Sequence, residues 1–121
     1  DGAHISDGTP LAEGAALLSG HERVAAIGIN CTPPRFIPDL IRAVAAVTDK
    51  PIIVYPNSGE TYDPLTKRWH WLGEAIPAEF GTYSREWRKL GAGLIGGCCR
   101  TTPDHVRQIS DRFRKRTWPI A

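Results

Sequence analysis

Gly91-Ala-Gly-Leu-Ile-Gly-Gly-Cys-Cys-Arg-Thr-Thr-Pro-Asp104 sets the pattern for the rest of the chain. Within it, the apolar pair Leu94-Ile95 leads through two glycines to the adjacent cysteines Cys98 and Cys99. Thr102-Pro103 then begins a helix, because a hydroxyl at the cap accepts a bond from an unpaired N–H and proline suits the first helical position. The stretch therefore predicts a strand that ends in two thiols and is followed at once by a helix.

Two more predicted strands precede this stretch. Residues 24–31 are apolar almost without interruption until Asn30, which is typical of a strand buried on both faces. Thr32-Pro33 follows, and then a helical stripe. The apolar positions of that stripe are Ile37, Leu40, Ile41, Val44 and Val47. Residues 51–56 form the next predicted strand, with Asn57-Ser58-Gly59 as its turn.

The remaining segments complete an alternating pattern. A strand stub is expected before a first helix, which begins at Thr9-Pro10 and runs to about Gly20. Residues 60–79 have no clean period, so we expect a long loop there. The next helical stripe, closed by Gly91, consists of Phe80, Tyr83, Trp87 and Leu90. In the last helix we expect the inward residues to be Val106, Ile109 and Phe113.

Alternating strands and helices predict an α/β fold with a parallel sheet. The 121 residues are enough for a single domain with one core. A repeating unit of about 30 residues is what a (β/α)8 TIM barrel needs, and a whole barrel takes about 250 residues. The chain therefore holds about half of such a barrel. It begins at Asp1 and contains no methionine, which suggests a piece of a longer protein.

Charge and hydropathy exclude some classes of partner. The 15 Lys and Arg residues against 13 Asp and Glu give a net charge of +2 without a basic stripe, so we expect no nucleic-acid partner. The one basic cluster consists of Arg112, Arg114, Lys115 and Arg116, where cations favour the end of a helix. The sequence has neither a membrane-length apolar run nor a signal segment, and only three cysteines. We expect a soluble cytoplasmic protein with no membrane contact.

The three cysteines are the main candidates for chemistry. Cys31 ends one predicted strand, and Cys98 and Cys99 end another. Because the carboxyl ends of parallel strands share one edge, the three sulfurs can converge there. Three thiolates suit Zn²⁺ and leave its fourth position open, as in catalytic sites. Cysteines packed as small hydrophobes are an equally weighted alternative, and a vicinal disulfide is a further one.

Other polar residues offer weaker signals. The four histidines, His4, His21, His70 and His105, are expected at solvated positions, with His70 alone kept as a weak candidate. Glu60 and Asp63 could meet a cationic group, although capping is the favoured role of each. Trp69 and Trp71 suit either an aromatic wall for a sulfonium or simple packing. Gly96-Gly97 alternatively suggests a phosphate-binding barrel enzyme, which would not explain the cysteines.

Three ordered motifs resemble one known family. They are Gly28-Ile-Asn-Cys-Thr-Pro33, Val54-Tyr-Pro-Asn-Ser-Gly-Glu60 and Gly96-Gly-Cys-Cys-Arg-Thr-Thr-Pro103. Together they resemble the homocysteine S-methyltransferases, and most closely the branch that uses S-methylmethionine or S-adenosylmethionine. The resemblance implies the C-terminal half of a (β/α)8 barrel, with zinc held by Cys31, Cys98 and Cys99 and no further catalytic group. Asn30 and Glu60 are candidate substrate-binding residues.

The implied reaction passes a methyl group from a sulfonium to the homocysteine thiolate and gives methionine. The family's members have about twice this length or more, and nothing here matches their groups for the homocysteine amine. We expect either a missing N-terminal half or self-association to complete the barrel, and no turnover by this chain alone. A non-catalytic zinc-binding or association fragment is the alternative.

Overall fold

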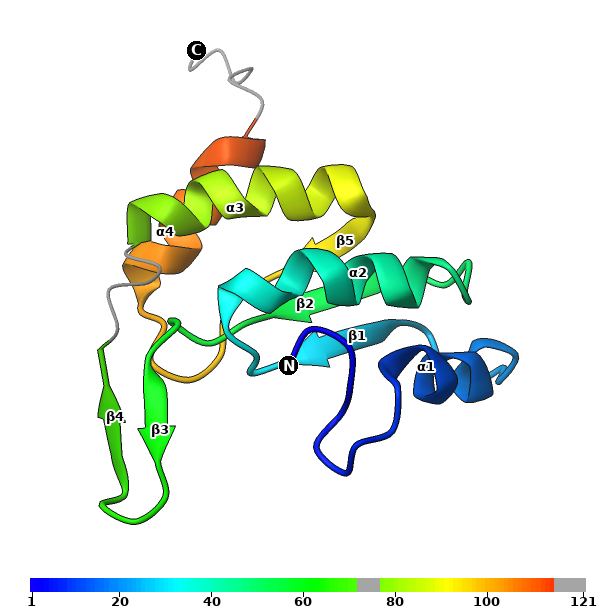
Figure 1. Cartoon of the computed structure of the whole chain (residues 1–121). Coiled ribbons are helices and arrows are strands. Elements are labelled where there is room, and N and C mark those ends of the chain that lie inside the picture. The colour runs from blue at the N-terminus through cyan, green and yellow to red at the C-terminus, as the bar shows by residue number, and fades with distance from the viewer. Residues whose placement is uncertain (72–76, 115–121) are drawn as a thin grey trace, which may run out of the picture.

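The computed structural model describes residues 1–71 and 77–114. Three parallel strands carry helices on one side, and a two-stranded hairpin projects from one end of the sheet (Figure 1). The helices are α1 (Leu11–Ser19), α2 (Ile37–Ala45), α3 (Pro77–Leu90) and α4 (Pro103–Phe113), with a 3-10 turn at Pro34–Phe36. The strands are β1 (Ile27–Asn30), β2 (Ile52–Tyr55), β3 (Thr61–Asp63), β4 (Arg68–His70) and β5 (Ala92–Ile95).

The main sheet has the order β1-β2-β5, and both pairings are parallel. Ile27 lies opposite Ile52 and Asn30 opposite Tyr55, so β1 and β2 end level with each other. The alternating pattern of the sequence is thus confirmed as an α/β arrangement with a parallel sheet. Within the described residues, β1 and β5 each pair with β2 alone, which leaves their outer edges free.

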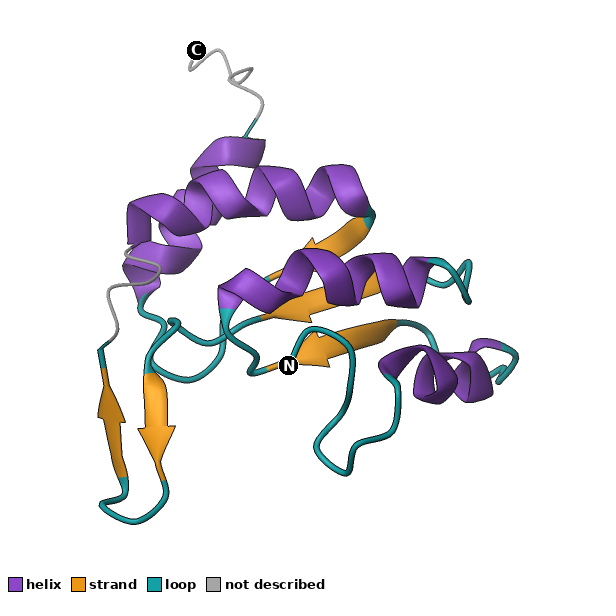
Figure 2. Cartoon of the chain, in the orientation of Figure 1, coloured by secondary structure: helices purple, strands orange, loops and turns teal. Residues whose placement is uncertain are grey.

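The core lies between one face of this sheet and the helices, as Figure 2 shows for α2 and α3. The side chains that the sheet contributes to this core are Ile27, Ile29, Ile52, Val54 and Ala92. The opposite face is open: Gly28 and Asn30 are exposed, and Leu94 is 48% exposed. The prediction that residues 24–31 are buried on both faces was therefore wrong, because the helices cover only alternate positions of the strand.

Helix α4 packs through different residues from those expected. Ile109 is buried as predicted, but Val106 and Phe113 are exposed. His105, four residues before Ile109, takes the inward position, and its ring lies 4.7 Å from that of Phe80 on α3. Its Nδ1 also accepts a hydrogen bond from the Thr102 backbone N–H at 3.0 Å. The prediction of a solvated position for His105 was wrong, because its ring caps the start of α4 and packs against Phe80.

The predicted loop at 60–79 contains a hairpin, in which β3 and β4 pair antiparallel. Tyr62 lies opposite Trp69 with ring centroids 5.2 Å apart, and this cross-strand aromatic pair stabilises the ribbon. The part of that loop at residues 72–76 lies outside the described residues, as do Lys115 and Arg116 of the basic cluster. In place of the expected strand stub, the first ten residues form an isolated bridge between His4 and Pro10.

No helix in the described part of the chain is long and apolar enough to cross a membrane.

Candidate metal centre

The three cysteines lie together at the carboxyl edge of the main sheet. Their sulfur atoms all lie within 4.8 Å of one another, and those of Cys98 and Cys99 are 4.0 Å apart. A tetrahedral zinc site with bonds of about 2.3 Å separates its sulfur ligands by roughly 3.8 Å, whereas a disulfide needs about 2 Å. All three are free thiols. The donor set therefore fits a soft divalent cation with small side-chain adjustments, and the convergence expected from the strand ends is present.

The segment Tyr55–Ser58, at the carboxyl end of β2, forms hydrogen bonds with the backbone of all three cysteines. The carbonyl of Tyr55 accepts a hydrogen bond from the Cys31 N–H at 3.0 Å, and the carbonyl of Pro56 accepts one from the Cys98 N–H at 2.8 Å. The Ser58 N–H donates to the Cys99 carbonyl at 3.1 Å. Because β2 is the central strand, its carboxyl end can reach loops on both sides. We call Tyr55–Ser58 the template segment, because its hydrogen bonds fix the backbone at all three cysteines.

Asn57 fixes the backbone of Cys31. The side chain of Asn57 is buried; its Nδ2 donates to the Cys31 carbonyl at 3.0 Å, and its Oδ1 accepts from the Gly59 N–H at 2.8 Å. Cys31 has a φ of 48°, a left-handed conformation that costs about 1 kcal/mol for a residue with a Cβ. Hydrogen bonds on both sides of Cys31 offset this strain, so the sulfur position depends on Asn57.

A tight turn presents Cys98 and Cys99. The Thr101 N–H and Oγ1 both donate to the Cys98 carbonyl, at 3.1 and 2.6 Å. A Cβ placed on Gly97 would lie 2.5 Å from Thr101 Oγ1, so only glycine fits there. The Gly96 N–H donates to Val54, and the Cys98 N–H is also occupied. These two N–H groups are therefore used within the fold and are not available to bind a phosphate.

Asn30 and Glu60, the two candidate substrate-binding residues, lie near this edge. Asn30 Oδ1 accepts a hydrogen bond from Cys98 Sγ at 3.3 Å. Glu60 Oε2 accepts bonds from Arg100 Nε and Ser58 Oγ, both at 2.8 Å. The hydrogen bond from Arg100 lowers the pKa of the Glu60 carboxyl below its usual value; burial opposes this effect, and the Ser58 hydroxyl and the Arg100 charge add to it. Glu60 is therefore an ionised partner of Arg100.

The other expected candidates lie elsewhere. His4 pairs with Asp1 at 3.0 Å on the surface, and His70 lies on the hairpin 3.9 Å from Asp63. Asp63 caps the hairpin turn, where it accepts bonds from the Leu65 N–H and Thr66 Oγ1. Trp69 packs on Tyr62 within the same hairpin. These contacts support the capping and packing interpretations for Asp63 and Trp69.

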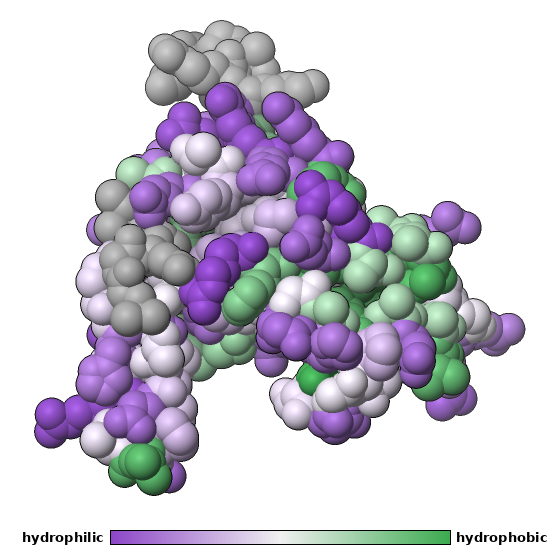
Figure 3. All heavy atoms as spheres, viewed as in Figure 1, coloured by the Kyte–Doolittle hydropathy of each residue, from purple (hydrophilic) through white to green (hydrophobic). Residues whose placement is uncertain are grey.

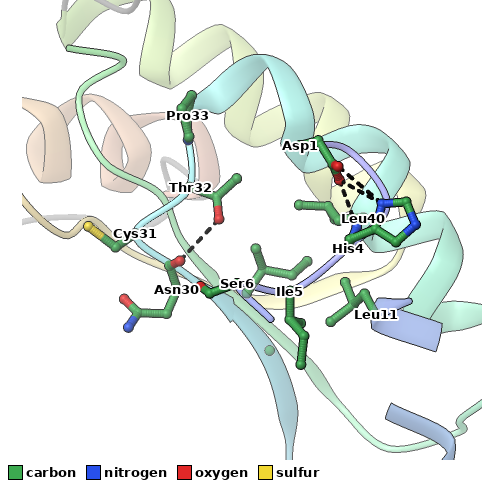
Figure 4. A pocket seen from close by; sticks show the side chains of 12 residues that line it. Asp1, His4, Ile5, Ser6, Leu11, Asn30, Cys31, Thr32, Pro33 and Leu40 are labelled. Atoms are coloured by element: carbon green, nitrogen blue, oxygen red, sulfur yellow. Dashed lines mark hydrogen bonds and ion pairs between the residues drawn. The ribbon is translucent and has the colours of Figure 1, made fainter. Parts of the chain in front are cut away.

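A cavity of about 600 Å³ lies beside β1 (Figure 4). Asn30, Cys31 and Thr32 line one side of it, and Asp1 and His4 lie across from them. Cys31 thus belongs both to the cavity wall and to the thiol cluster, and Asn30 links the wall to Cys98. The cavity therefore borders one end of the cluster, at Cys31.

Sequence reasoning missed the role of the Tyr55–Ser58 segment and of Arg100. The signal for the first was present, because a strand end followed by Asn57 and Ser58 places polar side chains next to a buried core. The ion pair of Arg100 joins residues 40 positions apart, and no local pattern indicates it.

The sequence as a whole matches known proteins. A sequence model of the homocysteine S-methyltransferases matches residues 1–113. This chain belongs to the homocysteine S-methyltransferase family. Homocysteine S-methyltransferase YbgG of Bacillus subtilis is 54% identical over 110 residues, which make up 91% of this chain and 34% of that protein. Selenocysteine methyltransferase of Astragalus bisulcatus is 48% identical over 109 residues, or 90% of this chain and 32% of that protein.

Solved structures of the family share the fold. The homocysteine methyltransferase MmuM from Escherichia coli, in its oxidized form, superimposes with a TM-score of 0.73 at 38% identity. The match covers 93% of this chain and 33% of that one. The chain thus spans about a third of the length of the family members it matches.

Proposed function

We propose that this chain is the zinc-bearing part of a homocysteine S-methyltransferase. The complete protein would transfer a methyl group from a sulfonium donor, S-methylmethionine or S-adenosylmethionine, to homocysteine and form methionine. The observation that carries the proposal is the cluster of three thiols within 4.8 Å at the carboxyl edge of a parallel sheet. Family membership supports the acceptor, and the names of the relatives include both homocysteine and selenocysteine as methyl acceptors.

Cys31, Cys98 and Cys99 would hold the zinc as thiolates. Bound zinc would supply a Lewis acid that keeps a coordinated thiol deprotonated near neutral pH, where a free thiol with a pKa of about 8.5 is mostly protonated. Asn30 restricts the Cys98 sulfur through its 3.3 Å hydrogen bond, and the Tyr55–Ser58 segment fixes the three backbones. The chain's own residues therefore do the positioning.

The transfer itself needs little acid–base assistance. The homocysteine sulfur attacks the methyl carbon, the carbon–sulfur bond of the sulfonium breaks, and its electron pair stays on the departing sulfur as a neutral thioether. A neutral leaving group requires no proton, so no general acid has to lie near it.

Asn30 is the better of the two candidate contacts for homocysteine, because it is exposed and borders both the cavity and Cys98. Glu60 remains a candidate for the amino group, although its carboxylate already binds Arg100 and Ser58. A reducing compartment keeps such thiols free, so we place the protein in the cytoplasm.

The single domain formed here would be the C-terminal part of a (β/α)8 barrel; the three parallel strands in its described residues are one fewer than the expected half would have, and the N-terminal part of the protein would complete the barrel. The free edges of β1 and β5 favour such association, since unpaired edges template further strands. A non-catalytic fragment that binds zinc or associates through these edges is the second candidate. Sizing beside an assay with homocysteine and S-methylmethionine distinguishes the two, because only the enzyme turns over.

The test is the metal content of the full chain, purified under reducing conditions with zinc present. We expect about one zinc per chain for the wild type and almost none for Cys98→Ser, because a serine hydroxyl is a poor replacement for a thiolate. Thr66→Ala on the hairpin is the control and should keep the zinc. In the complete enzyme, Cys98→Ser should abolish methyl transfer. A folded wild-type chain that takes up no zinc contradicts the proposal.

A further inference from the structure

An ion pair joins the turn that bears the thiols to the template segment. Arg100 follows Cys99 directly, and its Nε lies 2.8 Å from Glu60 Oε2, with Nη2 at 3.4 Å from Oε1. Ser58 Oγ binds the same Glu60 oxygen, and the Ser58 N–H binds the Cys99 carbonyl. Ser58, Glu60 and Arg100 therefore form a closed bridge around Cys99, which we call the Glu60–Arg100 bridge.

Arg100 has a backbone conformation that glycine adopts more easily than arginine does. Arg100 has a φ of 65°, at the third position of the turn closed by the Thr101 N–H and the Cys98 carbonyl. Glycine fits such a position without strain, whereas any residue with a Cβ is strained there. The chain places an arginine where glycine would form the turn more easily. The arginine at this position makes the ion pair with Glu60, which glycine could not make.

The charge balance indicates what this ion pair contributes. The Glu60 side chain is only 11% exposed and is ionised, and it lies next to the edge where three thiolates would gather. A carboxylate that is this little exposed needs a partner of opposite charge. Arg100 neutralises Glu60 and at the same time fixes the turn. Both effects act on Cys99, which is the exposed member of the cluster.

We propose that Glu60 and Arg100 are positioning residues that hold Cys99 in reach of a metal bound by Cys31 and Cys98. The inference rests on the proposed zinc site and adds two residues that are not themselves metal ligands. Mutation of residues that orient metal ligands commonly lowers metal affinity by roughly 10–100-fold. This ion pair differs from an ordinary surface ion pair, because the Glu60 side chain is nearly buried and also accepts a hydrogen bond from Ser58.

The test measures Co²⁺ binding to the full chain under reducing conditions, through the absorption of sulfur-to-cobalt charge transfer. Glu60→Gln and Arg100→Gly should each weaken Co²⁺ binding by roughly 10–100-fold. The double variant should be no weaker than the single ones, because residues that act as a unit are not additive. Arg100→Lys should fall between Arg100→Gly and the wild type, since it keeps the charge and loses the planar fork.

Arg100→Gly separates positioning from a merely structural role. Glycine relieves the strain of the turn and so offsets the lost ion pair, and the metal-free variant should melt close to the wild type. Asp39→Asn is the matched control: it breaks the 2.8 Å pair of Asp39 with Arg42 on the surface of α2 and should leave cobalt affinity unchanged.

Unchanged cobalt affinity in both Glu60→Gln and Arg100→Gly overturns the inference. It is also overturned if the weaker binding of each variant is fully accounted for by a larger unfolded fraction of the metal-free chain. A folded wild-type chain that binds no cobalt at all overturns the proposed zinc site and this inference together, which distinguishes the two failures.

Discussion

Two neighbouring parts of the chain, at and after the end of β2, differ in burial and in the range of their contacts. The Tyr55–Ser58 segment is mostly buried and makes its hydrogen bonds with residues near positions 31 and 98. The β3–β4 hairpin begins only three residues later, and it projects into solvent with Leu65 at 92% exposure. Figure 3 shows apolar atoms at the far end of this projection. The hairpin's own contacts, such as Tyr62 with Trp69, are local.

The difference shows where precision is needed. The template segment must hold sulfur atoms that follow two other strands within a few ångströms, and its polar side chains Asn57 and Ser58 are buried and hydrogen-bonded. The hairpin satisfies its own backbone and needs no distant residue. We therefore expect substitutions in the template segment to alter both stability and metal binding, and substitutions in the hairpin to alter neither strongly.

The largest effect is expected for Asn57→Ala. The change removes the bond to the Cys31 carbonyl and the bond from the Gly59 N–H, and it leaves partly buried groups without partners. The free energy of unfolding should fall by about 2–3 kcal/mol. Freed from its restraint, the left-handed Cys31 can relax, so cobalt affinity should fall as well. Chemical denaturation and cobalt titration measure the two effects.

Asn30→Ala is the matched control for this prediction. Asn30 is exposed, and it touches the cluster through a single bond to Cys98. Its removal should change stability by no more than about 0.5 kcal/mol. If Asn30→Ala destabilised the chain as much as Asn57→Ala, the contrast between template and surface would be wrong.

Much of the fold follows from patterns that act over short distances. Apolar runs and Thr-Pro junctions identified the main strands and helices, and their alternation implied a parallel sheet. From that topology alone, the ends of β1 and β5 fall on one edge, so Cys31 and Cys98 could be placed together without any contact information. The site was predictable to the extent that topology determines it.

The parts that could not be predicted depend on long-range contacts or on pairing between weak elements. His105 is buried because Phe80 lies across from it, which the pattern of α4 cannot show. The hairpin depends on pairing between three-residue strands, and each is too short to have a period. The bond of Asn57 to Cys31 spans 26 residues. Each of these features needs the three-dimensional packing first.

A smaller effect is expected when the Glu60–Arg100 bridge is titrated in the metal-free chain. The pKa of Glu60 is lower in the folded state, chiefly because Arg100 donates a hydrogen bond to the carboxylate. Such a group adds stability that is fully present above its unfolded pKa of about 4.3 and is lost as pH falls through the folded pKa. Near pH 7, the free energy of unfolding of the wild type should exceed that of Glu60→Gln by about 1 kcal/mol.

This difference should stay constant from about pH 6 to 8 and disappear in acid, because the protonated carboxyl then resembles the amide. Urea denaturation at a series of pH values measures it. A difference that persisted unchanged at pH 3 would show that Glu60 stabilises the chain by packing rather than by its charge.

The smallest effect is expected at the hairpin turn. Asp63 accepts bonds from the Leu65 N–H and the Thr66 hydroxyl, so Asp63→Ala should loosen the turn. Amide hydrogen exchange in residues 61–70 should become faster, while global stability changes by no more than about 0.5 kcal/mol, because all of these groups are at the surface. Protection of the Cys31 and Cys98 amides and the affinity for cobalt should stay the same, since the Tyr55–Ser58 segment carries their hydrogen bonds. A loss of cobalt affinity in this variant would mean that the hairpin and the template segment act as one unit, and that the thiol cluster depends on the contacts of both.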